Sequence, residues 1–240
     1  MTILINPALG ASQKLYSGGS NTCFKAITKG GPTPTQITDT SGRGNHGVFT
    51  KAPEPVLVGD LWCYQFVNAD SEYVTVPDIT ELLGATEATW CAWVRKDAYV
   101  ANQCVVSDYS DATWAHRKWL LGNEATENKW RVYAGDGTSA TAVIEIDSVF
   151  TTGWHFVWMR FTGGSATGLE SGCDDSVGTP ATTASVAALG AVAKGLTNIG
   201  RHTGTTYSSM TLGALTIWPY AISDAEIQKW RYHVKRQLGL

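Results

Sequence analysis

Short windows in which apolar and polar residues alternate run through most of the chain and predict β-strands. Gly, Asp and Asn residues separate these windows at intervals of about ten residues, as in a sandwich of two antiparallel sheets. The helical patterns that a parallel α/β fold would need between its strands are missing from the chain. The sequence therefore predicts an all-β, two-sheet antiparallel sandwich. The predicted strands are Trp62–Val67, Tyr73–Val76, Thr89–Arg95, Cys104–Ser107, Lys118–Gly122, Trp130–Ala134, Ala142–Asp147, His155–Phe161, Asn198–Gly200 and Leu212–Trp218.

The same alternation predicts which side chains share a face of a strand. Cys91 and Trp93 point to one side of their strand, and Trp90 points to the other. In His155–Phe161 both alternating sets are largely apolar, which predicts a central strand that is covered on both sides.

One segment near the end of the chain has the pattern of an amphipathic helix. Ile227, Trp230 and Val234 recur at steps of three and four residues. Ser223 or Asp224 is expected to cap the start of this helix, Glu226 to support its first turn, and Gly239 to mark its end.

The stretch from Asp39 to Gly47 predicts a tight loop, because its three glycines favour positive φ or a close approach of two backbones. The side-chain oxygens of Asp39, Ser41 and Asn45 can bond nearby backbone N–H groups, so this loop can be held without a metal ion. Residues 1–38 are rich in Gly, Thr and Pro, and we expect them to form an N-terminal arm or extension. Residues 39–240 then form the sandwich domain. The Ala-, Thr- and Ser-rich residues 176–195 are expected to add a strand with flanking loops.

Composition and charge narrow the possible partners. Hydrophobic residues make up 43% of the chain, enough for a sizeable core, whereas charged residues make up only 16%. The formal net charge is −3 and basic residues cluster only at the C-terminal helix, so nucleic-acid binding is not expected. The chain contains no run of about 20 apolar residues, so no membrane-spanning helix is predicted. Without a signal peptide after Met1, we expect synthesis in the cytoplasm.

The five cysteines are odd in number and include no CxxC pair, which argues against both a zinc site and a secreted disulfide framework. Cys63 and Cys91 lie in strand-like apolar runs, where we expect buried free thiols.

Several motifs, in order along the chain, resemble the laminin-G-like, concanavalin A-like lectin/glucanase jelly-roll family. The resemblance extends from about Asp39 to Lys229 and implies a jelly-roll sandwich that binds or adheres. No motif that carries it is catalytic. These motifs are the Gly-rich loop, Tyr73-Val74-Thr75-Val76-Pro77, Thr89-Trp90-Cys91-Ala92-Trp93-Val94, Gly153-Trp154-His155-Phe156-Val157, Asn198-Ile199-Gly200 and Ala221-Ile222-Ser223-Asp224-Ala225-Glu226-Ile227.

The strongest enzymatic signal is Glu145-Ile146-Asp147, because glycanases of this fold carry paired carboxylates on one strand face. The chain continues with Ser148, Val149 and Phe150 and offers no second Glu as proton donor. We therefore expect no enzyme activity and no catalytic residue. Glu145 is then part of an ordinary polar strand face.

The resemblance also implies that calcium could bind on loop oxygens, although no cofactor is required. The candidate ligands are Asp39, Asn45 and Asp108, which supply the hard oxygen atoms that Ca²⁺ prefers. Their spacing matches no strict calcium motif, and turn capping is the competing interpretation, favoured for Asp39. Asp111 and the pair Asp174-Asp175 are further acidic positions with the same ambiguity.

A ligand-binding segment is expected where aromatic and polar residues share a loop, because sugars need an aromatic platform with polar partners. The candidates are Tyr109, Asp111, Trp114, His116 and Arg117. The alternative is that Trp114 simply packs against the sandwich.

Three functions remain. The favoured one is a non-catalytic structural or attachment module of a larger particle, a bacteriophage virion decoration or tail-associated protein by analogy. It would contact other protein subunits through its N-terminal arm, with surface polysaccharide as a further partner, at the surface of a virion or extracellular particle. The second is a soluble, calcium-assisted lectin-like module, and the third, disfavoured, is a glycanase.

Overall fold

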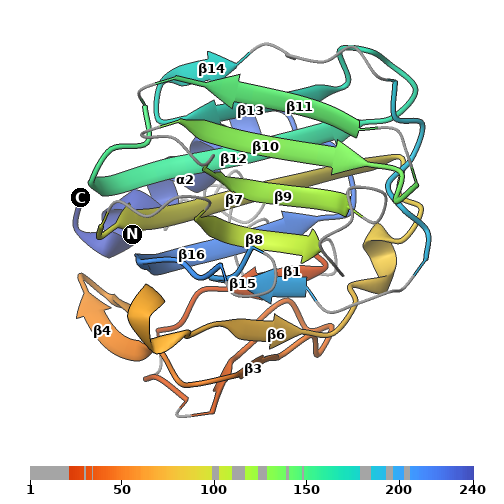
Figure 1. The fold of residues 1–240 in the computed structure, drawn as a ribbon. Helices are drawn as coiled ribbons and strands as arrows, with labels where there is room; N and C mark the ends of the chain where they lie inside the picture. Colours follow the sequence, from red (N-terminus) through yellow and green to blue (C-terminus); the bar gives the residue numbers. More distant parts are fainter. Residues whose placement is uncertain are drawn as a thin grey trace, which may run out of the picture.

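The computed structural model describes residues 22–29, 31–33, 35–98, 103–109, 117–123, 129–138, 141–147, 149–178, 185–192, 197–202 and 206–240. These residues form two layered antiparallel sheets with one helix packed on the outside (Figure 1). The sandwich predicted from the alternating pattern is therefore confirmed. In the described part of the chain, no helix is long and apolar enough to cross a membrane.

Each sheet has eight strands, and all strand pairs are antiparallel. Sheet A runs in the order β14 (Ser176–Gly178), β13 (Leu169–Cys173), β12 (Gly153–Thr162), β7 (Glu87–Lys96), β16 (Met210–Trp218), β5 (Leu61–Phe66) and β4 (Glu54–Val58), with β1 (Phe24–Ala26) also paired to β16. Sheet B runs in the order β11 (Thr141–Ile146), β10 (Trp130–Gly135), β9 (Arg117–Asn123), β8 (Cys104–Tyr109), β15 (Thr197–Ile199), β6 (Val74–Val76), β3 (Gly47–Phe49) and β2 (Gln36–Ile37). Two 3-10 turns, η1 (Asn68–Asp70) and η2 (Thr80–Leu82), lie in the connections.

The main core fills the space between the two sheets. Trp90 on β7 and Trp119 on β9 meet there with ring centroids 5.2 Å apart. Trp130 on β10 packs against Phe150 at 5.3 Å, and all four side chains are fully or almost fully buried. Large aromatic groups from both inner faces thus join the two sheets.

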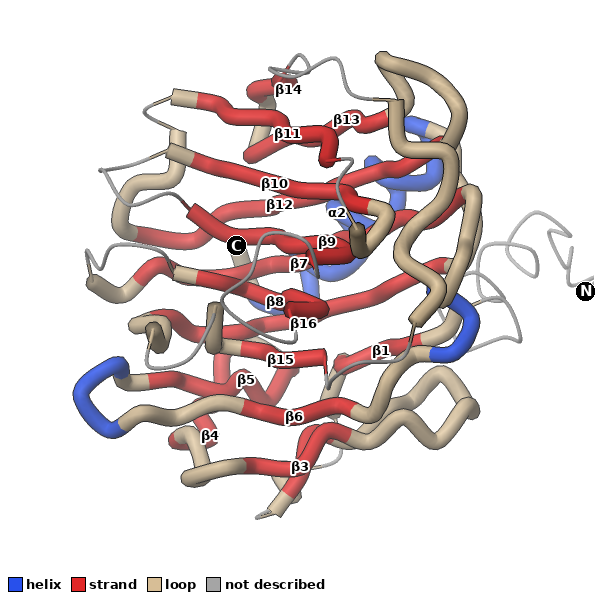
Figure 2. The backbone as a smooth tube through the Cα atoms, turned by 45° about the vertical axis from the view of Figure 1, so that its right-hand side comes forward, coloured by secondary structure: helices blue, strands red, loops and turns tan. Residues whose placement is uncertain are grey.

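A second core lies between the outer face of sheet A and the helix α2 (Asp224–Leu238), which covers that face in Figures 1 and 2. Cys91 and Trp93 on β7 face this second core, whereas Trp90 faces the first, as predicted. On β12, Phe156 and Trp158 face the helix, and the alternate residues face sheet B. The prediction of a strand covered on both sides is confirmed.

The predicted helix signals correspond to the observed caps of α2. The Ser223 hydroxyl accepts a hydrogen bond from the Glu226 N–H at 3.3 Å, and the Glu226 carboxylate accepts one from the Ser223 N–H at 2.9 Å. This reciprocal pair is a capping box. Gly239 ends the helix with φ of 71°, a left-handed conformation that glycine adopts at little cost.

All ten predicted strands are present, but six further strands had no clear pattern: β1, β2, β3, β4, β13 and β14. All six are only two to five residues long, which leaves little room for an alternation. Of the segment 176–195, in which one strand was expected, the structure describes residues 176–178 and 185–192, and the strand within these is β14.

The boundary predicted after residue 38 is wrong for part of the arm. Residues 24–26 of β1 pair with Leu215–Ile217 of β16, and β2 pairs with β3. Both strands are therefore integral to the sheets, because backbone pairing and burial outweigh the Gly- and Pro-rich local sequence. The described sandwich begins at Thr22, and the rest of the predicted arm, residues 1–21, lies outside the described residues.

Candidate functional site

The ligand-binding segment predicted around Trp114 is described only at its two ends. Tyr109 ends β8 and Arg117 begins β9, and their backbones are paired with each other. Asp111, Trp114 and His116 lie outside the described residues, so the predicted ligand site stays a prediction.

The Gly-rich loop is held by the buried carboxylate of Asp39. One oxygen accepts hydrogen bonds from the backbone N–H groups of Lys25 and Ser41, both at 2.9 Å. The other accepts from the Ser41 hydroxyl at 2.7 Å and the Asn45 N–H at 3.0 Å. The Asn45 amide in turn donates to the Cys23 carbonyl at 2.8 Å. Two of the three calcium candidates, Asp39 and Asn45, therefore share one hydrogen-bonded turn.

The third calcium candidate, Asp108, lies elsewhere in sheet B, because β15 and β6 separate β8 from β3. Its buried carboxylate accepts a hydrogen bond from the Lys118 ammonium at 3.0 Å, and Asp78 lies 3.8 Å from the same nitrogen. Burial raises the pKa of Asp108 above its usual value, and the interaction with Lys118 only partly opposes this rise. A lysine ammonium thus takes the place of a cation beside Asp108.

The carboxylates of the Glu145-Ile146-Asp147 motif are ion-paired on the edge of sheet B. Glu145 lies 2.9 Å from the guanidinium of Arg131 and 3.2 Å from the Lys129 ammonium. Asp147 contacts the same ammonium at 3.1 Å. These pairs neutralise the negative charges.

A groove that the sequence did not reveal runs between the outer face of sheet A and helix α2. We call it the α2 groove, and its volume is about 310 Å³. It is lined by Trp158, Arg160, Glu170, Asp174, Asp175, Val177, Asp224, Ile227, Gln228, Arg231 and Tyr232. Because these residues come from β12, β13, β14 and α2, only the folded molecule brings them together.

Two local features shape the floor of the groove. Gly172 on β13 is paired with Trp158, and a Cβ atom at position 172 would lie 2.3 Å from the indole nitrogen of Trp158. Glycine at this position therefore leaves room for the indole ring. Asp174 has φ of 54°, unusual for a residue with a side chain, and it turns the chain between β13 and β14.

Arg160 links three elements at one side of the groove. Its guanidinium contacts Glu170 at 2.5 Å and Asp224 at 2.8 Å, and it donates to the Ile222 carbonyl at 2.8 Å. It also lies over the Trp158 ring, 5.9 Å from the ring centroid, which is within the limit of about 6 Å for a cation–π contact. Desolvation lowers the pKa of Arg160, but the two carboxylates outweigh it and the net shift is upward.

Arg231 occupies the other side of the groove. Its guanidinium contacts Asp175 at 2.7 Å and lies over the rings of Phe156 at 5.4 Å and Tyr232 at 5.8 Å. The Nε atom of Arg231 is buried and has no hydrogen-bond partner in the described residues.

The charge of the groove favours a neutral or cationic ligand. Two guanidinium groups stand against the four carboxylates of Glu170, Asp174, Asp175 and Asp224, a net formal charge of −2. Asp175 and Asp224 are mostly exposed, and Tyr232 is 58% exposed. An exposed aromatic ring beside carboxylate acceptors and guanidinium donors is the combination that a hydroxyl-rich ligand needs.

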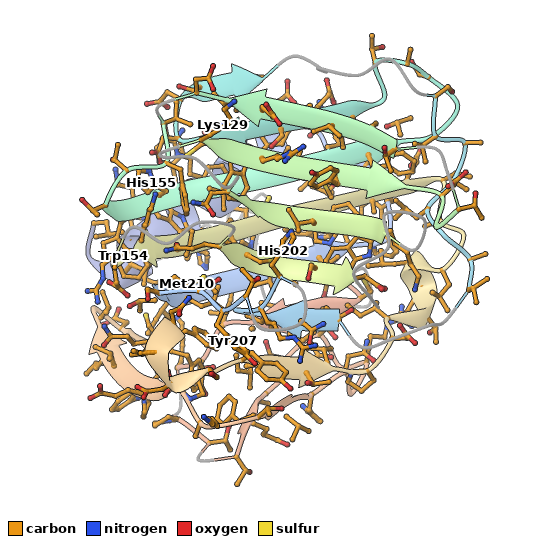
Figure 3. All side chains as sticks on the ribbon, viewed as in Figure 1. Lys129, Trp154, His155, His202, Tyr207 and Met210 are labelled. Atoms are coloured by element: carbon orange, nitrogen blue, oxygen red, sulfur yellow. The ribbon has the colours of Figure 1, made fainter. Side chains whose placement is uncertain are left out.

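A mixed cluster of His155, Cys173 and Asp174 adjoins the groove through Asp174. His155 lies near the start of β12 (Figure 3). His155 Nδ1 lies 2.7 Å from an Asp174 carboxylate oxygen and 3.9 Å from Cys173 Sγ. Desolvation raises the pKa of Asp174, but hydrogen bonds from His155 and the Phe156 N–H outweigh it and the net shift is downward. Burial raises the pKa of the Cys173 thiol.

This cluster does not have the geometry of a nucleophilic triad. In such a triad one imidazole nitrogen faces the nucleophile and the other faces the carboxylate. Here Nδ1 faces both Cys173 and Asp174, while Nε2 is bonded to the Thr151 carbonyl at 2.8 Å. The histidine therefore cannot act as the general base of such a triad, because no second nitrogen is left to face the thiol.

The other cysteines are structural. All five cysteines of the chain are buried free thiols, which confirms the prediction for Cys63 and Cys91. The odd number of cysteines and the lack of a CxxC pair were the sequence signals against a disulfide framework.

The fold and the groove together define a lectin-like β-sandwich with a candidate ligand groove beside its outer helix. The chain belongs to the concanavalin A-like lectin/glucanases superfamily, whose laminin-G-type profile matches residues 68–228. This match confirms the resemblance inferred from the sequence motifs. No curated protein matches the chain.

Solved structures with the same fold include domains of larger proteins. The binding domain of Paraclostridial Mosquitocidal Protein 1 is 11% identical, with a TM-score of 0.66 over 88% of this chain and 51% of that one. The binding domain of botulinum neurotoxin DC, in complex with rat synaptotagmin II, is 10% identical, with a TM-score of 0.61 over 89% and 52%. Trypanosoma rangeli sialidase is 12% identical, with a TM-score of 0.60 over 88% and 32%. The chain thus spans about a third to a half of these structures, and at such identities the likeness shows the fold alone.

Proposed function

We propose that this protein is a non-catalytic attachment module that uses the α2 groove to hold a glycan. The observation that carries the proposal is the groove itself, in which the exposed Tyr232 ring lies beside Arg–carboxylate pairs in a fold of the lectin/glucanase superfamily. Aromatic stacking and hydrogen bonds to fixed polar groups are the usual means of holding a sugar ring.

The electrostatics support binding rather than catalysis. A glycosidase needs one carboxylic acid that gives a proton and a second carboxylate nearby that acts as nucleophile or base. In the α2 groove Glu170, Asp175 and Asp224 each contact an arginine guanidinium, so these carboxylates are placed as hydrogen-bond acceptors in fixed ion pairs. The pair Glu145 and Asp147 is likewise engaged by cationic groups.

The net negative groove makes neutral sugars and amino sugars better ligands than acidic ones. Sialic and uronic acids carry a carboxylate that the four acidic side chains would repel. This charge preference is a specific consequence of the proposal.

The larger setting that we propose is a particle, as the low charged fraction and the arm-like start of the chain suggest. In this setting the module is a bacteriophage decoration or tail-associated subunit at the surface of a virion or similar extracellular particle. Residues 1–21 would contact neighbouring subunits, and the groove would contact surface polysaccharide.

The test is binding of the purified chain, displayed multivalently, to a polysaccharide panel with calcium and with a chelator. Multivalent display can raise apparent affinity by about 10²–10⁴, which makes a weak single site measurable. We expect binding to neutral or amino-sugar polymers that Tyr232→Ala abolishes, whereas Tyr207→Ala, an aromatic loss outside the groove, leaves it intact.

Four other results would contradict part or all of this proposal. A blank panel under both conditions would remove the glycan function and leave protein contacts as the role of the module. Binding that is lost with Trp114→Ala but kept with Tyr232→Ala would place the site in the segment Tyr109–Arg117 instead. Binding lost on chelation would favour the calcium-assisted lectin, and release of reducing ends would show a glycanase.

A further inference from the structure

Three different ligand atoms lie close together where the start of β12 meets the end of β13. His155 is at the start of β12, Cys173 ends β13, and Asp174 forms the turn that follows. The side-chain Nδ1, Sγ and carboxylate oxygen all lie within 4.8 Å of one another. His155 and Cys173 are 6% and 0% exposed, whereas the Asp174 side chain is 36% exposed and also lines the α2 groove.

The partners of His155 require a proton or a metal ion between its Nδ1 atom and the Asp174 carboxylate. Nε2 faces the Thr151 carbonyl at 2.8 Å, and because a carbonyl only accepts, Nε2 carries a proton. Nδ1 faces a carboxylate oxygen at 2.7 Å, a contact between two lone pairs unless something positive lies between them. A proton can fill this position, and so can a metal ion that also draws in Cys173 Sγ.

We infer that His155, Cys173 and Asp174 form a zinc site with one open coordination position. Nitrogen, sulfur and oxygen donors are all ligands of Zn²⁺, whereas Ca²⁺ and Mg²⁺ require oxygen donors alone. Three protein ligands with a free fourth position are the usual number for an accessible zinc ion. The exposed edge of Asp174 gives the ion its path from the groove.

The outer contacts are those that a histidine and a carboxylate make when they bind a metal. A ligating histidine donates its other N–H group to a carbonyl, as Nε2 does to Thr151. The second oxygen of Asp174 accepts from the Phe156 N–H at 2.9 Å, which fixes the carboxylate. The backbone of β12 and of the segment just before it thus holds both His155 and Asp174 in place.

Charge and geometry are compatible with an ion at this place. A thiolate, a carboxylate and a neutral imidazole balance the two charges of Zn²⁺, so the buried site becomes neutral overall. Tetrahedral zinc separates its nitrogen and oxygen ligands by about 3.3 Å, a value that follows from bonds of about 2.0 Å. The Nδ1–oxygen distance of 2.7 Å must therefore widen slightly, which the partly exposed turn at Asp174 permits.

The test uses the full-length chain, freed of metal and titrated with Zn²⁺ alone or Co²⁺ alone. We expect one equivalent of Zn²⁺ to bind, and Co²⁺ to give a thiolate-to-metal charge-transfer band with the strong visible bands of tetrahedral coordination. Cys173→Ala should remove the charge-transfer band, and Asp174→Ala should weaken binding more than about 100-fold, because loss of even an outer partner costs about 10–100-fold.

A matched control is Cys91→Ala, which removes another fully buried free thiol that faces the second core. This variant should keep the charge-transfer band. Near-ultraviolet circular dichroism of the tryptophan side chains should show that both cysteine variants are folded. If Cys173→Ala does not fold, the Asp174→Ala variant, which changes a partly exposed side chain, still decides whether the site binds the metal. The inference would be overturned if the wild type bound no stoichiometric metal or bound it without a charge-transfer band. A band that persists in Cys173→Ala, or an unchanged metal affinity in Asp174→Ala, would also overturn it.

Discussion

At the residue scale, single polar groups hold segments of backbone that have no regular structure. The Asp39 carboxylate accepts four hydrogen bonds within the loop that connects β2 and β3. Two of the donors are the buried backbone N–H groups of Lys25 and Ser41, and both lose this acceptor if the carboxylate is removed. One side chain therefore fixes both the loop and the adjacent strand β1.

We predict that Asp39→Ala lowers the free energy of unfolding by about 3 kcal/mol, because it leaves these buried donors unpaired. Ser41→Ala, which removes only one of the four donors, should cost about 1 kcal/mol. Urea unfolding of both variants measures the difference. Equal losses would show that the carboxylate does not organise the loop. A chelator that destabilises the wild type but not Asp39→Ala would instead support calcium at Asp39.

A second residue-scale prediction concerns His233 on α2. Burial lowers the pKa of His233 below the ordinary histidine value of 6.5, with further lowering by the positive charges of Lys29, Arg236 and Lys25. The unfolded chain therefore takes up this proton before the folded protein does, so stability falls as the pH drops below about 6.5. His233→Gln should flatten the stability profile between pH 7 and the lowered pKa.

Urea unfolding at a series of pH values measures this slope. Tyr232→Gln, a neighbouring change on the same helix that adds no titration in this range, should keep the wild-type slope. An unchanged slope in His233→Gln would assign the pH dependence to other groups.

At the scale of elements, helix α2 is stabilised by its contacts with sheet A. Trp230 is 1% exposed, packs against Phe156 and Trp218, and donates its indole N–H to the Thr216 hydroxyl at 3.1 Å. Tyr232, two residues further on, is mostly exposed. The same helix thus presents one face to a core and the other to the α2 groove and solvent.

We predict that Trp230→Ala lowers the free energy of unfolding by about 3–5 kcal/mol, because it opens a cavity between the helix and sheet A. Tyr232→Ala, an aromatic loss on the exposed face, should change stability by less than about 1 kcal/mol. Chemical unfolding followed by tryptophan fluorescence distinguishes the two. Similar small losses in both variants would show that α2 is only loosely attached.

At the scale of the whole molecule, sheet A is covered on both faces, by sheet B on one side and by helix α2 on the other. The proposed function assigns the contacts with other subunits to residues 1–21, which lie outside the described residues.

We predict that the full-length chain is an oligomer in solution, because an arm that docks on a neighbouring subunit joins copies of the chain. Light scattering coupled to size exclusion measures the mass, and limited proteolysis tests the arm. In the oligomer residues 1–21 should be protected, and dilution to the monomer should expose them. A compact monomer whose first 21 residues resist protease would remove the support for a particle subunit.

The sequence alone determined the class of fold and the positions of its main elements. Alternation with a period of two marked ten strands, eight of which have six or more residues, and local capping signals marked both ends of α2. The superfamily was also recognisable from motifs such as Gly153–Val157, since they are continuous in the chain. The short strand β1 escaped, because its pairing depends on β16, which lies far away in the sequence.

Only the tertiary structure decided where ligand chemistry comes together. The α2 groove joins residues from β12 to β14 with others on α2, about fifty positions further along, and no local pattern links them. The cysteine spacing argued against a zinc site, yet strand pairing places Cys173 beside His155 and Asp174. The physical reason is the same in both cases: hydrogen-bonded strands bring distant residues into register, so a binding site can form without a motif in the sequence.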